Sequence, residues 1–136
     1  MEVHTGRLID HVHLRAKDLA ATRRFYAAIL TVLGVPFVSD DSHFQADELW
    51  IDVGEPATHV HLAFQARDRA TVDRVYEAAL EAGGRDNGRP GERPYHPGYY
   101  ACFLLDPDGN NIEAVHHGEA ERSAESVTIT FEPPQA

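Results

Sequence analysis

The stretch His11-Val-His-Leu-Arg-Ala-Lys-Asp18 recurs fifty residues later as His61-Leu-Ala-Phe-Gln-Ala-Arg-Asp68. The register of this repeat continues to Gly34 and Gly84, and nine of the 24 aligned positions are identical. A shared hydrophobic pattern accounts for apolar matches, but it does not account for the matched histidines that open the stretches or the aspartates that close them. The chain is therefore interpreted as two related halves.

Each half begins with a predicted strand and helix. Residues 11–16 and 59–66 alternate between polar and apolar side chains, which is typical of a half-buried strand, and the histidines lie on the polar faces, away from the helix. Asp18 and Asp68 occupy N-cap positions, and apolar residues follow at helical spacing. Gly34 and the pair Gly83-Gly84 are predicted to end the two helices.

Several strands are predicted after each helix. Short strands are expected near 35–40, 43–46 and 48–53, whereas residues 85–97 are rich in Gly, Pro and charge and are expected to form a loop. Two longer strands, 99–105 and 111–117, are joined by Asp106-Pro-Asp-Gly109, the sequence of a type I turn. The predicted fold class is α+β, with two tandem βαβββ modules that form a cup-shaped, mostly antiparallel sheet.

The whole chain, 1–136, is expected to form one domain. Module one covers about 8–54, module two about 58–117, and residues 118–136 form a C-terminal tail. Val127, Ile129 and Phe131 alternate in this tail and predict a last short strand that pairs with a sheet edge or with another subunit.

Composition excludes several classes of function. A net charge of −10 repels nucleic-acid phosphates, and the twelve Lys and Arg residues form no basic stripe. No apolar run is long enough to cross a bilayer, so no membrane partner is expected. The N-terminus shows no secretory signal and the single cysteine, Cys102, cannot form an intrachain disulfide, so the chain is expected to be cytoplasmic.

The residues that carry chemistry are expected on the inner walls of the cup. Glu113 lies between Ile112 and Ala114, where a carboxylate is costly to bury unless it is paired or binds a cation. His11 and His61 open equivalent strands, so a closed cup places them on equivalent walls and Glu113 can complete the set. Two imidazoles and one carboxylate form a facial triad that leaves positions open on a divalent metal. The predicted metal ligands are therefore His11, His61 and Glu113.

These motifs resemble those of the vicinal oxygen chelate superfamily, from about residue 8 to residue 117. Residues 8–14 are similar to its opening strand with the first ligand, residues 18–26 to its first helix, and residues 61–66 to its second ligand strand. Residues 97–113 resemble its most recognisable signature, in which the glutamate after the Asp-Pro-Asp-Gly turn is the third ligand. The resemblance implies the glyoxalase/dioxygenase-like fold and, because members usually pair their modules across a dimer, a homodimer whose two histidines could reach metals in different subunits.

A four-ligand glyoxalase I would carry a second glutamate near the end of the first half, where Glu48 lies. Symmetry with Glu113 puts the equivalent position nearer residues 50–52, so three protein ligands are expected. His59 shares a strand face with His61 and replaces it if the register slips by two residues, but the alignment of Phe64 with Leu14 favours His61.

Further residues are candidates for acid or base chemistry. His13 and His117 face the predicted cup, and they are named with Tyr100 as candidate catalytic residues. Tyr99 and Tyr100 lie on opposite faces of one strand, so only one of them can reach the cup. Arg93 and His96, in the predicted 85–97 loop, could meet an anionic substrate.

The favoured hypothesis is a divalent-metal-dependent enzyme that binds two neighbouring oxygens of a small-molecule substrate. The metal is Fe, Mn, Ni or Zn, and the reaction is isomerisation, lyase chemistry or dioxygen insertion, since one scaffold of this kind hosts many reactions. The alternative is a non-catalytic binding protein that resembles the bleomycin-resistance branch; such proteins generally lack the three ligands, so His11, His61 and Glu113 argue against it. A third interpretation is a structural domain that acts through its dimer surface.

Overall fold

A computed structural model describes residues 2–5, 9–119 and 127–130. The elements in chain order are β1 (Glu2–Thr5), β2 (Val12–Ala16), α1 (Leu19–Leu33), β3 (Val38–Ser39), β4 (His43–Ala46), β5 (Leu49–Val53), β6 (His61–Gln65), α2 (Arg69–Glu81), β7 (Arg85–Glu92), β8 (Tyr100–Leu105), β9 (Asn111–His116) and β10 (Val127–Thr130). Neither α1 nor α2 has the length and apolar character that a helix needs to cross a membrane.

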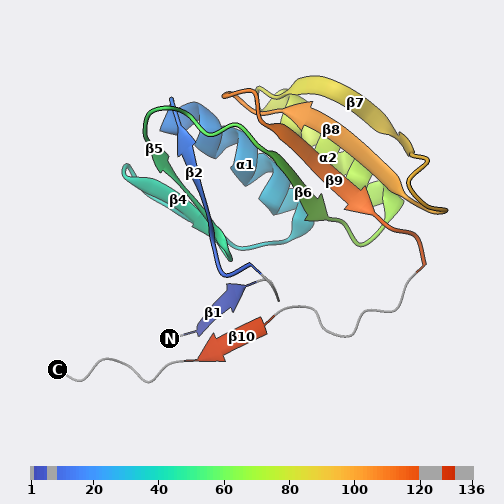
Figure 1. Ribbon diagram of the computed structural model, residues 1–136, viewed down its shortest axis with the longest axis horizontal. Helices are drawn as coiled ribbons and strands as arrows, with labels where there is room; N and C mark the ends of the chain where they lie inside the picture. The colour runs from blue at the N-terminus through green and yellow to red at the C-terminus, as the bar shows by residue number, and fades with distance from the viewer. Residues whose placement is uncertain (1, 6–8, 120–126, 131–136) are drawn as a thin grey trace.

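The strands between β2 and β9 form two sheets of the same topology, which Figure 1 shows side by side. The strand orders are β2-β5-β4-β3 and β6-β9-β8-β7. In each sheet the first strand of the module lies parallel to the last, with Val12 opposite Leu49 and His61 opposite Asn111, and the other pairs are antiparallel. The predicted α+β class with tandem βαβββ modules is thus confirmed, as two four-stranded sheets.

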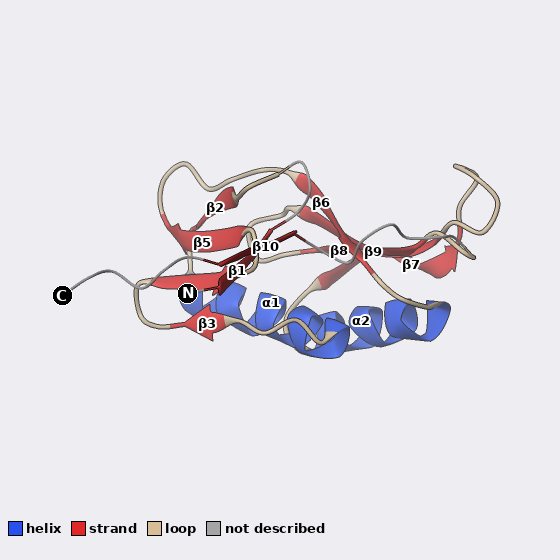
Figure 2. Ribbon diagram, turned by 90° about the horizontal axis from the view of Figure 1, so that it is seen from below, coloured by secondary structure: helices blue, strands red, loops and turns tan. Residues whose placement is uncertain are grey.

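Both helices lie on the same side of the sheets, as Figure 2 shows. Each helix begins as predicted, because the Asp18 carboxylate accepts from the Ala21 amide and the Asp68 carboxylate accepts from the Thr71 amide. Gly34 ends α1 in the left-handed conformation, with φ of 75°. The apolar strand faces pack against the helices, so the polar faces of β2 and β6 point away from them, as the alternation predicts.

The expectation of a loop over 85–97 is wrong for its first half, because residues 85–92 form β7. This strand lies at the edge of its sheet and pairs with β8, with register shifts on either side of Gly88. An edge strand tolerates proline and glycine, since half of its backbone groups need no partner in the ladder. A Cβ atom at Gly88 would lie 2.9 Å from Cδ2 of Phe103, so the close approach of β7 to β8 requires glycine there.

The predicted last strand exists, but within the chain it pairs with neither edge of the two sheets; its pairing with another subunit stays a prediction. β10 pairs antiparallel with β1, with Glu2 opposite Thr130, and β1 itself was not predicted. Phe131, the third residue of the predicted alternation, lies outside the described residues.

The turn between β8 and β9 links the two modules. The Gly109 amide donates to the Asp106 carbonyl at 3.0 Å, and Gly109 adopts φ of 84°. The buried Asp106 carboxylate accepts from the backbone amides of Asp108 and Asn110, from the Asn110 side chain, and from the Tyr26 hydroxyl of α1 at 2.6 Å. Burial, followed by the charge of Asp106, raises the pKa of Tyr26 well above its usual value, so the hydroxyl stays protonated and donates.

Candidate functional site

The second sheet brings His61 and Glu113 together on its face away from the helices. His61 opens β6, and Glu113 lies on the adjacent β9, opposite Ala63. The Nε2 atom of His61 lies 2.7 Å from Oε1 of Glu113. The side chain of Glu113 is only 2% exposed whereas that of His61 is 54% exposed, so the carboxylate is buried behind an imidazole that solvent can reach.

The second carboxylate oxygen of Glu113 is held by Tyr99. The Tyr99 hydroxyl donates a short hydrogen bond to Oε2. Burial first, and then this hydrogen bond, raise the pKa of Tyr99 to about 12, so the hydroxyl remains a donor at neutral pH. Glu113 therefore has one oxygen directed at His61 and the other occupied by a fixed hydroxyl.

Two further histidines extend this face beyond Tyr99. The His117 ring lies 5.2 Å from the Tyr99 ring, edge to face, and stacks on His96 with 5.1 Å between centroids. The Nδ1 atom of His117 lies 2.9 Å from Nε2 of His96. His96 belongs to the segment that was predicted to border the cup, and the structure brings it against His117.

Phe103 and Arg93 complete the same face. Phe103 lies directly opposite Glu113 in the β8–β9 ladder, and its ring centre is 6.0 Å from that of His61. The guanidinium carbon of Arg93 lies over the Phe103 ring, 5.4 Å from its centre. Tyr99 and Phe103 are the members of this cluster that sequence reasoning did not assign to it.

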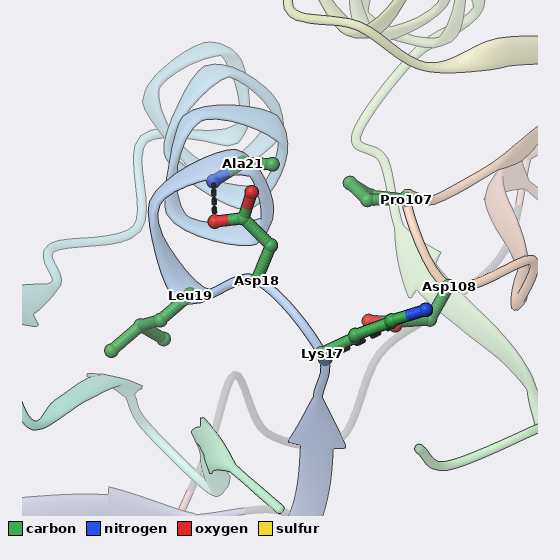
Figure 3. Close-up of a pocket in the computed structure, with 6 residues that line it drawn as sticks. All are labelled: Lys17, Asp18, Leu19, Ala21, Pro107 and Asp108. Atoms are coloured by element: carbon green, nitrogen blue, oxygen red, sulfur yellow. Dashed lines mark hydrogen bonds between the residues drawn. The ribbon is translucent and has the colours of Figure 1, made fainter.

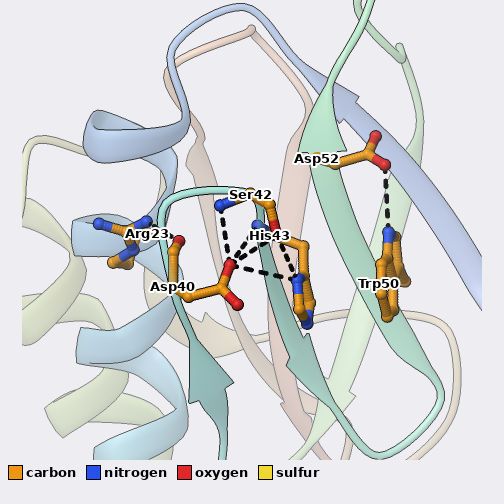
Figure 4. A network of polar contacts seen from close by, with 6 residues as sticks. All are labelled: Arg23, Asp40, Ser42, His43, Trp50 and Asp52. Carbon is orange, nitrogen blue, oxygen red and sulfur yellow. Dashed lines mark hydrogen bonds and ion pairs between the residues drawn. The ribbon is translucent and has the colours of Figure 1, made fainter.

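The first sheet carries its own polar network on the equivalent face, part of which is drawn in Figure 4. The Nε2 atom of His13 lies 2.7 Å from Oδ1 of Asp52, and this hydrogen bond is the main cause of a lowered pKa at Asp52. Trp50 donates to the other oxygen of Asp52, and the His43 ring stacks on Trp50 at 4.1 Å. His13 and Asp52 thus form a second histidine–carboxylate pair, in module one.

Trp50 stands where a fourth metal ligand would be expected. It lies opposite His13, as Glu113 lies opposite Ala63, and residues 13 and 63 are equivalent in the repeat. The side chain at the position equivalent to Glu113 is therefore an indole. The equivalent position thus falls within the range 50–52 that symmetry predicted, and three protein ligands stay a prediction.

The remaining predicted site residues lie elsewhere. His11 precedes β2, is exposed, and its Nδ1 atom lies 2.8 Å from Oδ1 of Asp10. Tyr100 faces α2, where its hydroxyl donates to Asp73 at 2.6 Å, so it is not among the residues around Glu113. His61, and not the alternative His59, contacts Glu113; His59 is exposed.

A separate open hollow lies at the start of α1 and is drawn in Figure 3. It is lined by Lys17, Asp18, Leu19, Ala21, Pro107 and Asp108. The Lys17 amide donates to Asp108 there at 3.1 Å. None of the residues around Glu113 lines this hollow.

The His61–Glu113 pair fits two ligands of a divalent metal. Histidine nitrogen and carboxylate oxygen bind such ions at about 2.0–2.2 Å, so neighbouring ligands lie about 3 Å apart. The 2.7 Å between Nε2 and Oε1 is close to that separation. Within residues 2–5, 9–119 and 127–130, no group of three or more His, Cys, Asp or Glu side chains is placed to hold a metal, so the third predicted ligand, His11, is not brought to the pair.

Comparison with known proteins identifies the family. The family model of the Glyoxalase/Bleomycin resistance protein/Dioxygenase superfamily matches residues 8–114. The uncharacterized protein YqjT of Bacillus subtilis is 30% identical, in a match that covers 79% of this chain and 97% of YqjT. The chain therefore belongs to the glyoxalase/bleomycin resistance/dioxygenase group, which is the vicinal oxygen chelate superfamily.

Solved structures agree with this assignment. A glyoxalase/bleomycin resistance protein from Albidiferax ferrireducens is 31% identical, with a TM-score of 0.66 over 79% of this chain and 96% of that one. The oxidase ChaP-H2 shares the fold at 23% identity, with a TM-score of 0.55 over 79% of this chain and 91% of its own. Members of the family bind small molecules and commonly use divalent metals.

Proposed function

We propose that this protein is a divalent-metal-dependent enzyme of the glyoxalase/dioxygenase type that acts on a small substrate with two neighbouring oxygens. The observation that supports the proposal is the buried Glu113 carboxylate with His61 on one oxygen and Tyr99 on the other. A buried carboxylate costs free energy unless its charge is compensated. The partner of Oε1 here is the exposed imidazole of His61, and imidazole is a common metal ligand. We assign His61 and Glu113 as two ligands and His11 as the third.

His11 joins the pair only if the first module approaches the second more closely, within one chain or between two. A homodimer, which the family resemblance implies, would bring module one of a second copy against module two. The bound Fe, Mn, Ni or Zn would act as a Lewis acid toward both substrate oxygens.

The protein's own side chains would position and deprotonate the substrate. Tyr99 keeps one oxygen of Glu113 occupied and so directs the other toward the ligand position. His117 is the favoured base, because its ring is held by His96 on the same face. His13 would serve as acid or base if module one forms the opposite wall of the site. Tyr100 is not assigned a catalytic role, because its side chain lies on the helix-facing side of β8 and donates to Asp73.

Metal content tests the proposal. Protein purified anaerobically without a metal-affinity tag is analysed by mass spectrometry, beside His11→Ala, His61→Ala and Glu113→Gln. His59→Ala is the matched control, since His59 is an exposed histidine two residues before β6 and it is His61 that contacts Glu113. We expect near-stoichiometric metal in the wild type and the control, and loss in the three ligand variants. A wild type that neither contains nor takes up metal would contradict the proposal and favour a non-catalytic small-molecule binding protein.

A further inference from the structure

The guanidinium of Arg93 and the imidazole of His61 both lie near the ring of Phe103. The guanidinium of Arg93 lies 5.4 Å from the centre of the Phe103 ring, and the His61 ring lies 6.0 Å from the same centre. Phe103 therefore lies next to both the Arg93 guanidinium and the exposed His61 imidazole.

The backbone of β7 leaves room for this guanidinium. A Cβ atom at Gly91 would lie 3.1 Å from Nη1 of Arg93, and one at Gly88 would lie 3.4 Å from Nη2. Nη2 donates to the Arg89 carbonyl at 2.7 Å and Nη1 donates to the Glu92 carbonyl at 3.3 Å. Arg93 is therefore held in place by backbone groups, and glycines line the space it occupies.

The charge of Arg93 has no carboxylate partner in the part of the chain that the structure describes. Its neighbour Glu92 is paired with Arg69 of α2, Nη2 to Oε1 at 2.8 Å. Arg93 is half-buried, and the burial of a charge costs free energy unless the charge is compensated. Two of the five N–H groups of the guanidinium donate to the backbone, which leaves others for a ligand.

We infer that Arg93 forms an anion subsite that binds the carboxylate of the substrate, opposite the end that His61 and Glu113 bind. The planar guanidinium matches a carboxylate through two parallel hydrogen bonds. The inference rests on the proposed function and narrows its substrate class to small carboxylates that carry two neighbouring oxygens.

The probes are 3,4-dihydroxybenzoate and 3,4-dihydroxybenzamide, which share a pair of neighbouring hydroxyls and differ in the charge at the opposite end. Calorimetric titration compares both probes on the metal-loaded wild type, Arg93→Gln and Arg93→Lys. Arg89→Gln is the matched control, because Arg89 contributes only its carbonyl to the Arg93 contacts. Metal content is measured on every preparation.

We expect the wild type to bind the acid about 10- to 100-fold more tightly than the amide, the range of one charge-assisted hydrogen bond. Arg93→Gln should remove this preference and change the affinity for the amide less than about twofold, while Arg93→Lys should keep part of the preference through its charge. The control should behave as the wild type does.

The outcomes separate this inference from the proposed function. A wild type that holds metal but binds both probes equally, or binds neither, overturns the anion subsite and leaves metal dependence standing. Retention of the preference in Arg93→Gln also overturns it. A wild type that neither contains nor takes up metal defeats the proposed function. The same titration is then made on the metal-free protein, where a preference for the acid that is lost in Arg93→Gln would support the subsite.

Discussion

The Nε2 atom of His96 lies 2.9 Å from Nδ1 of His117, while Nδ1 of His96 lies 2.9 Å from the Pro97 carbonyl oxygen. A carbonyl can only accept, so Nδ1 of His96 carries a proton. When His96 is neutral its Nε2 atom has a lone pair, and Nδ1 of His117 must donate to it. The chain of contacts therefore leaves Nε2 of neutral His117 without a proton and available as a base.

This relationship predicts the tautomer of His117. Long-range ¹H–¹⁵N spectra above neutral pH should show His117 protonated at Nδ1 in the wild type. Substitution of His96 by Phe should shift His117 toward the Nε2-protonated form, which free imidazole side chains prefer, whereas His96→Gln should keep the original form because its amide oxygen can accept. An Nε2-protonated His117 in the wild type would show that the inferred proton positions are wrong.

Tyr99 should contribute to metal affinity without being a ligand. Its hydroxyl donates to Oε2 of Glu113, and loss of such a supporting hydrogen bond typically weakens metal binding by about 10- to 100-fold. We expect that loss in Tyr99→Phe, measured by competition with a chelator. Tyr100→Phe is the control, because that hydroxyl donates to Asp73 on the opposite face of β8. Equal affinities in the two variants would contradict this role.

The hydroxyl of Tyr26 should contribute more to the free energy of unfolding than the hydroxyl of Tyr76, the equivalent residue of the second module. Tyr26→Phe removes a donor from the buried Asp106 carboxylate and is expected to lower the free energy of unfolding by about 2 kcal/mol. Tyr76 occupies the equivalent position of α2 but is only partly buried, so Tyr76→Phe should cost less than about 0.5 kcal/mol. Urea titrations of both variants measure the difference, and similar losses would mean that Asp106 does not depend on Tyr26.

Asp40 should make stability depend on pH in the acid range. Hydrogen bonds from the Ser42 hydroxyl, and then from the Ser42 and His43 amides, lower the pKa of Asp40 from 3.8 to about 2 (Figure 4). Because the folded-state pKa is lowered, the stabilisation is complete above the usual value and is lost as pH falls from about 4 to about 2.

The variant Asp40→Asn should therefore be less stable than the wild type at pH 6, with the difference shrinking toward pH 2. Asp41→Asn makes the same change of charge at the next residue, which takes no part in the described hydrogen bonds of this turn. A pH dependence that is the same in Asp40→Asn and in the wild type would assign the acid sensitivity to other groups.

Much of the fold could be predicted because local and repeated signals agreed. Asp18 and Asp68 cap helices as their spacing indicates, and the offset of fifty residues reproduces the matched strand order of the two sheets. The strand β7 was missed because its glycines and proline are compatible with an edge strand as well as with a loop. Its pairing with β8 is a tertiary contact that composition does not reveal.

The part of the candidate site that short sequence motifs mark could be predicted. His61 and Glu113 were identified from the repeat and the turn, and the structure brings them together. The choice between Tyr99 and Tyr100 could have been made by counting from the turn: Leu105 opposite Asn111 requires Phe103 opposite Glu113, which puts Tyr99 on the same face. The contact between His96 and His117 spans a segment without regular structure, and no periodic signal predicts it.

The separation of the strands into two sheets has a consequence for synthesis of the chain. Among the described strands, no ladder joins the β2–β5 sheet to the β6–β9 sheet, and β5 supplies the last strand of the first. Once residue 53 has left the ribosome, module one has every strand that its sheet requires, while module two is still being translated. The Tyr26 hydroxyl of α1 then has no Asp106 carboxylate to donate to until residue 106, in the turn before β9, has also been synthesised.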